Sequence, residues 1–207
     1  MEGIKNIIFD LGNVIINIDG DRTVAAMKDL GFNDFQESYT LIRQSDLFDL
    51  LEKGLISPDQ FRNELKSHFN QHVSSDELDK AWGAMLMDFP KKRIELIQKL
   101  QSKYRLFLLS NTNIIHYQKY NNDLINQFGF ELSSLFEKAY YSFDMGMRKP
   151  DLEIFKYVIR DSHLKPIETL FIDDAEANIE SAKKLGLQTL WIDVAKGDDI
   201  LDGLDGF

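Results

Sequence analysis

The feature that most limits the fold is an alternation of short apolar runs with stretches of helical periodicity. The apolar runs are mostly continuous, which is typical of parallel strands covered on both faces. Between them, apolar residues recur at about one helical turn, as in residues 91–100 and 152–159. This alternation predicts right-handed βαβ units and an α/β fold with a doubly wound, Rossmann-like parallel sheet. The predicted strands are Ile4–Asp10, Arg105–Ser110, Glu137–Tyr141, Thr169–Asp173 and Gln188–Asp193.

The interval between the first two predicted strands is much longer than a crossover needs. Residues 11–104 separate these strands, whereas a crossover connection takes about a dozen residues or more. We therefore predict an α/β core made of residues 1–18 and 90–207, and a helical insert, residues 19–89, that covers the carboxyl ends of the strands. Helix signals in the insert are Thr23–Leu30, Phe35–Arg43, Leu47–Lys53 and capping boxes that begin at Ser57 and Ser74.

Composition excludes several classes of protein. The chain has no cysteine, which rules out disulfide scaffolds, cysteine catalysis and cysteine-ligated metal sites. Its net charge is −10, and no basic stripe marks a nucleic-acid surface. No apolar run approaches the ~20 residues that span a bilayer, and no signal-peptide pattern is present. We expect a cytoplasmic protein with neither a nucleic-acid nor a membrane partner, and its oligomeric state is left open.

Polar side chains follow three of the predicted strands at the point where each ends. Asp10 ends the first strand, residues 110–112 (Ser-Asn-Thr) end the second, and residues 173–174 (Asp-Asp) end the fourth. Lys149 lies in a turn after the third strand. Because ligands of open parallel sheets bind outside the carboxyl ends of the strands, we expect these groups to form one site.

This combination of side chains predicts a chemistry. Carboxylates alone would repel an oxyanion, unless a hard cation such as Mg²⁺ lies between them. Lys149 and the backbone amides after Ser110 add the positive potential that a phosphate needs. Singly, each group also has an ordinary structural explanation: a strand-end carboxylate, a helix N-cap or a solvated lysine. Together they favour Mg²⁺-assisted phosphoryl transfer.

Five features of the chain resemble the haloacid dehalogenase-like (HAD) hydrolase superfamily over essentially its whole length. These are Phe9–Val14 (FDLGNV), Leu109–Thr112 (LSNT), Arg148–Pro150 (RKP), Phe171–Asp174 (FIDD) and Asn178. The helical insert resembles the type 1 cap of this superfamily. Within it, the motifs look most like the bacterial branch of α-D-glucose-1-phosphate phosphatases and the N-terminal phosphatase domain of soluble epoxide hydrolase.

The resemblance implies a covalent mechanism with Mg²⁺ as the cofactor. Asp10 would be the nucleophile, which attacks phosphorus and becomes an aspartyl phosphate that water then hydrolyses. The Asp10 carboxylate, the backbone carbonyl of Gly12 and the Asp174 carboxylate would hold the metal.

The resemblance also implies roles for the remaining motif residues. Ser110 and Asn111 would hold phosphate oxygens. Lys149 would bind the transferring group and neutralise both it and the nucleophile. Asp173, together with Asn178, would support the metal ligands from a second layer.

Position 12 departs from the usual pattern of HAD phosphatases. Those enzymes usually carry a second Asp here, which protonates the leaving alkoxide, whereas this chain has Gly12. Three explanations stay open: a substrate with a good leaving group, an acid elsewhere (Asp19, Asp46 or a metal-bound water), or a weak enzyme.

The resulting prediction is an Mg²⁺-dependent phosphatase that acts on a small phosphorylated metabolite such as a sugar phosphate. The alternatives are a 2-haloacid dehalogenase, which needs no second Asp, and a catalytically weak binding module. The adjacent carboxylates of Asp173 and Asp174 oppose the dehalogenase, because they would repel a carboxylate substrate.

Overall fold

The computed structural model describes residues 3–32, 46–69 and 71–204. Its centre is a parallel sheet of five strands in the order β3-β2-β1-β4-β5, so the predicted α/β doubly wound fold is confirmed. The chain builds outward from β1 to β3 and then crosses back to β4, which places a topological switch point between β1 and β4. The strands are β1 (Asn6–Phe9), β2 (Arg105–Ser110), β3 (Lys138–Tyr141), β4 (Thr169–Asp173) and β5 (Gln188–Trp191).

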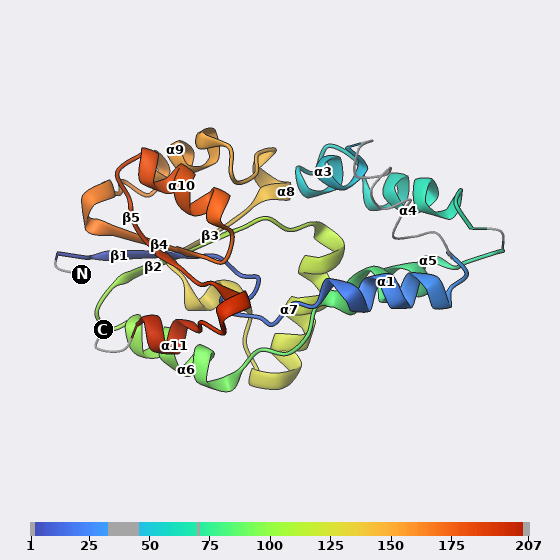
Figure 1. Ribbon diagram of the computed structural model, residues 1–207, viewed down its shortest axis with the longest axis horizontal. Coiled ribbons are helices and arrows are strands. Elements are labelled where there is room, and N and C mark those ends of the chain that lie inside the picture. Colours follow the sequence, from blue (N-terminus) through green and yellow to red (C-terminus); the bar gives the residue numbers. More distant parts are fainter. Residues whose placement is uncertain (1–2, 33–45, 70, 205–207) are drawn as a thin grey trace.

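Helices cover both faces of the sheet (Figure 1). Successive strand residues point to opposite faces, so Phe9 and Leu108 join one apolar cluster while Ile8 and Phe107 join another. This double covering is why the strands are apolar throughout. The first cluster includes residues of α6 (Lys91–Leu100), α7 (Ile114–Phe128) and α11 (Ile200–Gly203), and the second includes residues of α9 (Leu152–Asp161) and α10 (Glu176–Lys184).

The helical insert has an apolar cluster of its own. Phe48, Phe61 and Trp82 pack ring against ring there. Both predicted capping boxes, at Ser57 and Ser74, are present. The helices are α1 (Gly20–Asp29), α3 (Leu47–Glu52), α4 (Pro58–Lys66) and α5 (Ser75–Trp82); the helix predicted at Phe35–Arg43 lies outside the described residues.

Two neighbouring segments join the insert to the core. Ile18 and Leu86 form an isolated antiparallel bridge, and the Asp19 backbone N–H donates to the Met85 carbonyl at 3.0 Å. Figure 1 shows the insert extending to one side of the sheet, next to the start of α7. We retain residues 19–89 as its proposed limits.

Short helices complete the structure. α8 (Ser142–Met145) directly follows β3, and 3₁₀ turns span Gly83–Met85, Leu132–Leu135, Pro166–Glu168 and Val194–Lys196. Across the described part of the chain, every helix is too short or too polar to cross a bilayer.

Candidate active site

Lys149 is the centre of a buried ion-pair network at the carboxyl end of the sheet. Its Nζ atom donates to Asp10 Oδ1 at 2.7 Å and to Asp173 Oδ2 at 2.6 Å. Lys149 and Asp173 are almost completely buried, so the lysine is not the solvated side chain of the ordinary structural explanation. Asp10 directly follows β1 and Asp173 ends β4, on the two sides of the switch point. The fold therefore brings Asp10 next to Lys149, which lies 139 residues further along the chain.

The carboxylates carry charge at a cost that their surroundings partly offset. Burial raises the pKa of Asp10 well above its usual value; Lys149 opposes this rise, and the Asp173 carboxylate adds to it. Burial alone would lower the pKa of Lys149, but the two carboxylates raise it. Burial also raises the pKa of Asp174, although a hydrogen bond from Asn13 opposes the rise. Added positive charge would therefore favour the ionised forms of Asp10 and Asp174.

The carboxyl groups fit a hard divalent cation. Oxygens of Asp10, Asp173 and Asp174 lie within 4.8 Å of one another. Lys149 brings one positive charge to these three acids, which leaves the cluster with an excess of negative charge. Oxygen ligands and excess negative charge are what Mg²⁺ requires. The residues present therefore fit Mg²⁺, with Asp10 and Asp174 facing the pocket beside Gly12.

Asp173 is held by the start of the following helix. Its Oδ1 atom accepts from the Ala175 backbone N–H at 2.8 Å and from Asn178 Nδ2 at 2.9 Å. Its other oxygen accepts from Lys149. Asn178 thus binds the oxygen of Asp173 that does not face Lys149, and it orients Asp173 toward the lysine.

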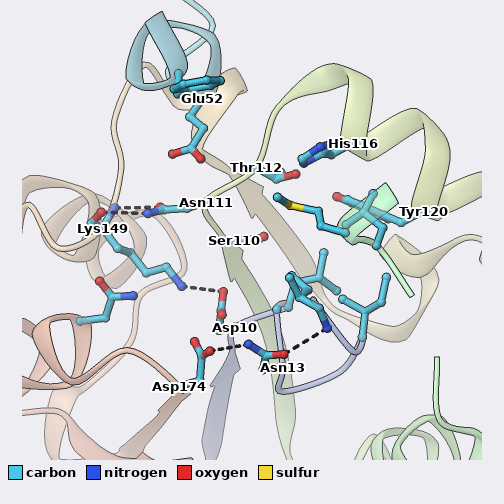
Figure 2. Close-up of a pocket in the computed structure, with 18 of the residues that line it drawn as sticks. Asp10, Asn13, Glu52, Ser110, Asn111, Thr112, His116, Tyr120, Lys149 and Asp174 are labelled. Carbon is cyan, nitrogen blue, oxygen red and sulfur yellow. Dashed lines mark hydrogen bonds and ion pairs between the residues drawn. The ribbon is translucent and has the colours of Figure 1, made fainter. Parts of the chain in front are cut away.

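The side chain of Asn111 forms two hydrogen bonds with the backbone of Lys149. Its Nδ2 atom donates to the Lys149 carbonyl at 2.8 Å, and its Oδ1 atom accepts from the Lys149 N–H at 2.9 Å (Figure 2). The amide therefore positions Lys149, and its two polar atoms are both occupied by the Lys149 backbone. Ser110 is buried at the end of β2 and lines the pocket. Asn113, rather than Ser110 or Asn111, caps α7.

The space beside Gly12 is filled by the side chain of Ile18. A Cβ atom at this position would lie 2.8 Å from Ile18 Cδ1 and 3.9 Å from Asp10 Oδ2. Neither carboxylate considered as a substitute acid reaches the pocket. Asp19 caps α1 and Asp46 precedes α3, and both lie outside the described pocket lining. The helices that they precede hold both carboxylates at the insert surface, away from Asp10.

Sequence reasoning missed Asn13. This residue has a left-handed backbone (φ 56°), donates to Asp174 Oδ2 at 2.8 Å and accepts from the Ile18 N–H at 3.1 Å. It thereby joins a proposed metal ligand to the loop that leads into the insert. The signal was its place in the FDLGNV motif, since Asn tolerates positive φ better than most residues.

Two further pocket residues, Glu52 and Tyr120, carried no sequence signal. Glu52 is at the end of α3 and pairs with Arg148 Nη1 at 3.1 Å. The Tyr120 phenol is buried on α7. Figure 2 shows both across the pocket from Asp10 and Asp174. The pocket has a volume of about 280 Å³, which suits a small metabolite.

Comparison with known proteins identifies the family. The family model of haloacid dehalogenase-like hydrolases matches residues 4–186. This chain belongs to that family. The hydrolase is 36% identical over 186 residues to D-ribitol-5-phosphate phosphatase of Bacteroides thetaiotaomicron, with 90% of each chain covered. A shorter match, 34% identical over 70 residues, links 34% of this hydrolase to 13% of bifunctional epoxide hydrolase 2 of Rattus norvegicus.

A solved structure of a HAD family enzyme from Bacteroides thetaiotaomicron is also similar. It contains magnesium and inorganic phosphate. This hydrolase matches it at 40% identity with a TM-score of 0.86, over 91% of this chain and 94% of that chain. That structure contains magnesium, and the three carboxyl groups gathered here also fit Mg²⁺.

Proposed function

We propose that this hydrolase cleaves the phosphate monoester of a small sugar or sugar alcohol in an Mg²⁺-dependent reaction. The observation that carries the proposal is the buried lysine between Asp10 and Asp173, next to Asp174. A lysine so placed opposes the rise in the pKa of Asp10 that burial causes, and it puts a group that attracts phosphate beside the carboxylate. The similarity to a sugar-alcohol phosphatase supports the substrate class.

The proposed reaction has two displacements at phosphorus. An Asp10 carboxylate oxygen attacks the phosphorus in line, the bond to the ester oxygen breaks, and an aspartyl phosphate forms. Water then attacks the same phosphorus, which releases inorganic phosphate and restores the carboxylate. Lys149 holds the nucleophile before attack and offers its charge to the phosphate oxygens, with Ser110 and the Asn111 backbone as further donors.

Mg²⁺ would be held by the carboxylates of Asp10 and Asp174 and the Gly12 carbonyl, and when bound it neutralises phosphate charge. Asp173 and Asn178 act on these groups from behind. Because position 12 carries no acid, we propose that the departing oxygen takes its proton from water. This proposal favours esters whose leaving groups need little protonation.

The test is phosphate release from p-nitrophenyl phosphate and a panel of sugar phosphates. We expect turnover with Mg²⁺, none with EDTA, and none with Asp10→Asn. A phosphorylated peptide containing Asp10, trapped by acid quench and found by mass spectrometry, would establish the covalent step. Turnover that survives in Asp10→Asn, or inert folded wild-type protein, would contradict the proposal; release of halide from 2-haloacids would then favour dehalogenation.

The proposal also covers the partner and the cellular location of the protein. We propose a small phosphorylated molecule as the partner and the cytoplasm as the location. Fractionation of cells that make the protein at natural levels, with detection by antibody, tests the location. Recovery of most of the protein in a membrane or secreted fraction would contradict it.

A further inference from the structure

The pocket above the catalytic aspartates has polar side chains that the phosphate chemistry does not use. Glu52, Thr112 and Tyr120, here called the polar wall, line it from α3, from the segment after β2 and from α7. Figure 2 shows them across the pocket from Asp10 and Asp174. A phosphate held at Ser110 and Lys149 would leave the rest of its molecule in the same pocket as the polar wall.

Two buried donors of this region, Tyr120 Oη and Trp82 Nε1, form no hydrogen bond of normal geometry with any described residue, although the Thr112 hydroxyl lies near the phenol. Both residues line the pocket and are nearly inaccessible to solvent. Burial raises the pKa of Tyr120 well above its usual value, Tyr141 adds to the rise, and the nearby Thr112 hydroxyl opposes it. The phenol is therefore a neutral donor, and burying it without a well-aligned acceptor is unfavourable. A ligand hydroxyl would supply that acceptor.

Glu52 adds an acceptor of fixed orientation. Its carboxylate lies 3.1 Å from Arg148 Nη1, and Arg148 also pairs with Asp49 at 2.7 Å. A carboxylate favours hydroxyl donors and repels a second anionic group on the substrate. Apolar side chains, among them Ile18, Met85 and Leu86, line the same pocket. The pocket therefore offers polar partners for hydroxyls and apolar contacts for C–H groups.

We infer that the polar wall binds the hydroxyl groups along the carbon chain of a linear, uncharged polyol phosphate. Glu52 accepts from one hydroxyl, and Tyr120 donates to another. This inference rests on the proposed phosphatase function and specifies the substrate class of that same site. The geometry points to a multi-hydroxyl chain, because Glu52 and Tyr120 reach the pocket from different helices (Figure 2).

The test is a substrate series that removes one hydroxyl-bearing carbon at a time. We expect kcat/KM to fall from D-ribitol 5-phosphate to erythritol 4-phosphate to glycerol 3-phosphate, by about 3- to 10-fold for each hydrogen bond lost. Geranyl monophosphate, which is apolar, and 3-phosphoglycerate, which carries a carboxylate, should be poorer than ribitol phosphate. A flat series, or a preference for either of these two esters, would overturn the inference.

Matched variants locate the effect. Tyr120→Phe should lower the ribitol-to-glycerol phosphate ratio of kcat/KM by about 3- to 10-fold. Tyr117→Phe removes a hydroxyl from the same helix outside the pocket lining, and it should leave the ratio unchanged. Glu52→Gln should lower the ratio by at least about 10-fold, because hydrogen bonds to charged groups are stronger. Asp49→Asn breaks the other ion pair of Arg148 and should not change the ratio.

A binding measurement separates this inference from the proposed function. Asp10→Asn protein with Mg²⁺ is titrated with D-ribitol 5-phosphate by calorimetry, with and without Tyr120→Phe. A several-fold weaker Kd in the double variant supports the polar wall even if turnover is absent. Turnover of p-nitrophenyl phosphate with equal Kd values in both proteins would refute the inference and leave the phosphatase intact.

Discussion

The two sides of the pocket differ in how completely their polar groups are paired. On the catalytic side, Lys149 is paired with Asp10 and Asp173, and Asp173 has further partners of its own. On the insert side, Tyr120 and Trp82 are buried together with their donor atoms. The charged groups of the first side are paired with one another, whereas two donors of the second side have no partner of normal geometry among the described residues.

The contrast separates the groups that act on phosphate from the groups that recognise the rest of the substrate. Groups that act on phosphorus need positions held before the substrate arrives, because pre-organised charges cost no rearrangement during the reaction. Groups that recognise the rest of the substrate gain selectivity by staying unpaired until the correct ligand arrives. The five predictions that follow test this division.

The largest effect is expected from the nucleophile. Asp10→Asn keeps the shape of the side chain but removes the attacking oxygen charge, so kcat should fall by at least about 10⁴-fold. Phosphate release in a stopped assay measures this. Circular dichroism of the variant should match the wild type. A loss below tenfold would remove Asp10 from the nucleophile role.

Removal of the lysine charge tests the completeness of the catalytic side. Lys149→Met leaves buried carboxylates without their cation and should cost about 3–5 kcal/mol in the free energy of unfolding, measured with urea in EDTA. Arg62→Met breaks the Arg62–Asp79 pair within the insert, which is nearer the surface, and should cost about 1 kcal/mol or less. Equal losses would contradict the contrast between the two regions.

Acid should weaken the junction of insert and core. His116 is buried on α7 with its Nε2 atom 3.1 Å from the Trp82 carbonyl, and burial lowers its pKa to about 4. The unfolded chain takes up this proton near pH 6.5, so stability present above pH 6.5 is lost as pH falls toward 4, by about 3 kcal/mol.

The control for this acid effect is His116→Gln, which keeps an N–H donor but does not titrate in this range. The stability of this variant, measured by urea unfolding at several pH values, should depend less steeply on pH between 6.5 and 4. Identical slopes would exclude His116 as the cause.

An acid restored at position 12 should speed the slowest esters. Ile18 Cδ1 would lie 2.8 Å from a Cβ at position 12, and Ile18→Val deletes that methyl group. Gly12→Asp combined with Ile18→Val should raise kcat about 10-fold for alkyl esters and less for p-nitrophenyl phosphate, whose leaving group needs no proton. Ile18→Val alone is the control. Equal gains on both esters would refute the missing-acid explanation.

The smallest effect is expected where insert and core pair at the surface. Arg148 Nη1 lies 2.7 Å from Asp49 on α3, and both side chains are partly exposed. Asp49→Asn should lower the free energy of unfolding by about 1 kcal/mol or less, and 0.5 M salt should remove most of the difference. A larger, salt-insensitive loss would show that this pair, rather than apolar contact, holds the insert in place.

Much of the core was predictable because its signals are local. Each strand is a continuous apolar run, and Asp10, Ser110 and Asp173 each lie at or directly after a strand end. Parallel strands share one carboxyl edge, so the gathering of these residues follows from fold class alone. Glu52 and Tyr120 lie on helices with no repeat or motif around them. Their convergence depends on how the insert packs on α7, through contacts such as Trp82 with His116.

The strands, the insert after the first strand, and the carboxylates and lysine at one edge of the sheet could all be predicted from the sequence. Those features follow from short-range periodicity and from turn and capping residues, which act within a few positions along the chain. Three contacts became visible only in the folded structure: Asn111 holds the Lys149 backbone, Ile18 fills the space beside Gly12, and Glu52 faces Asp10 and Asp174. These contacts join residues whose separation is set by packing, because the orientation of one unit on another depends on the whole buried surface between them.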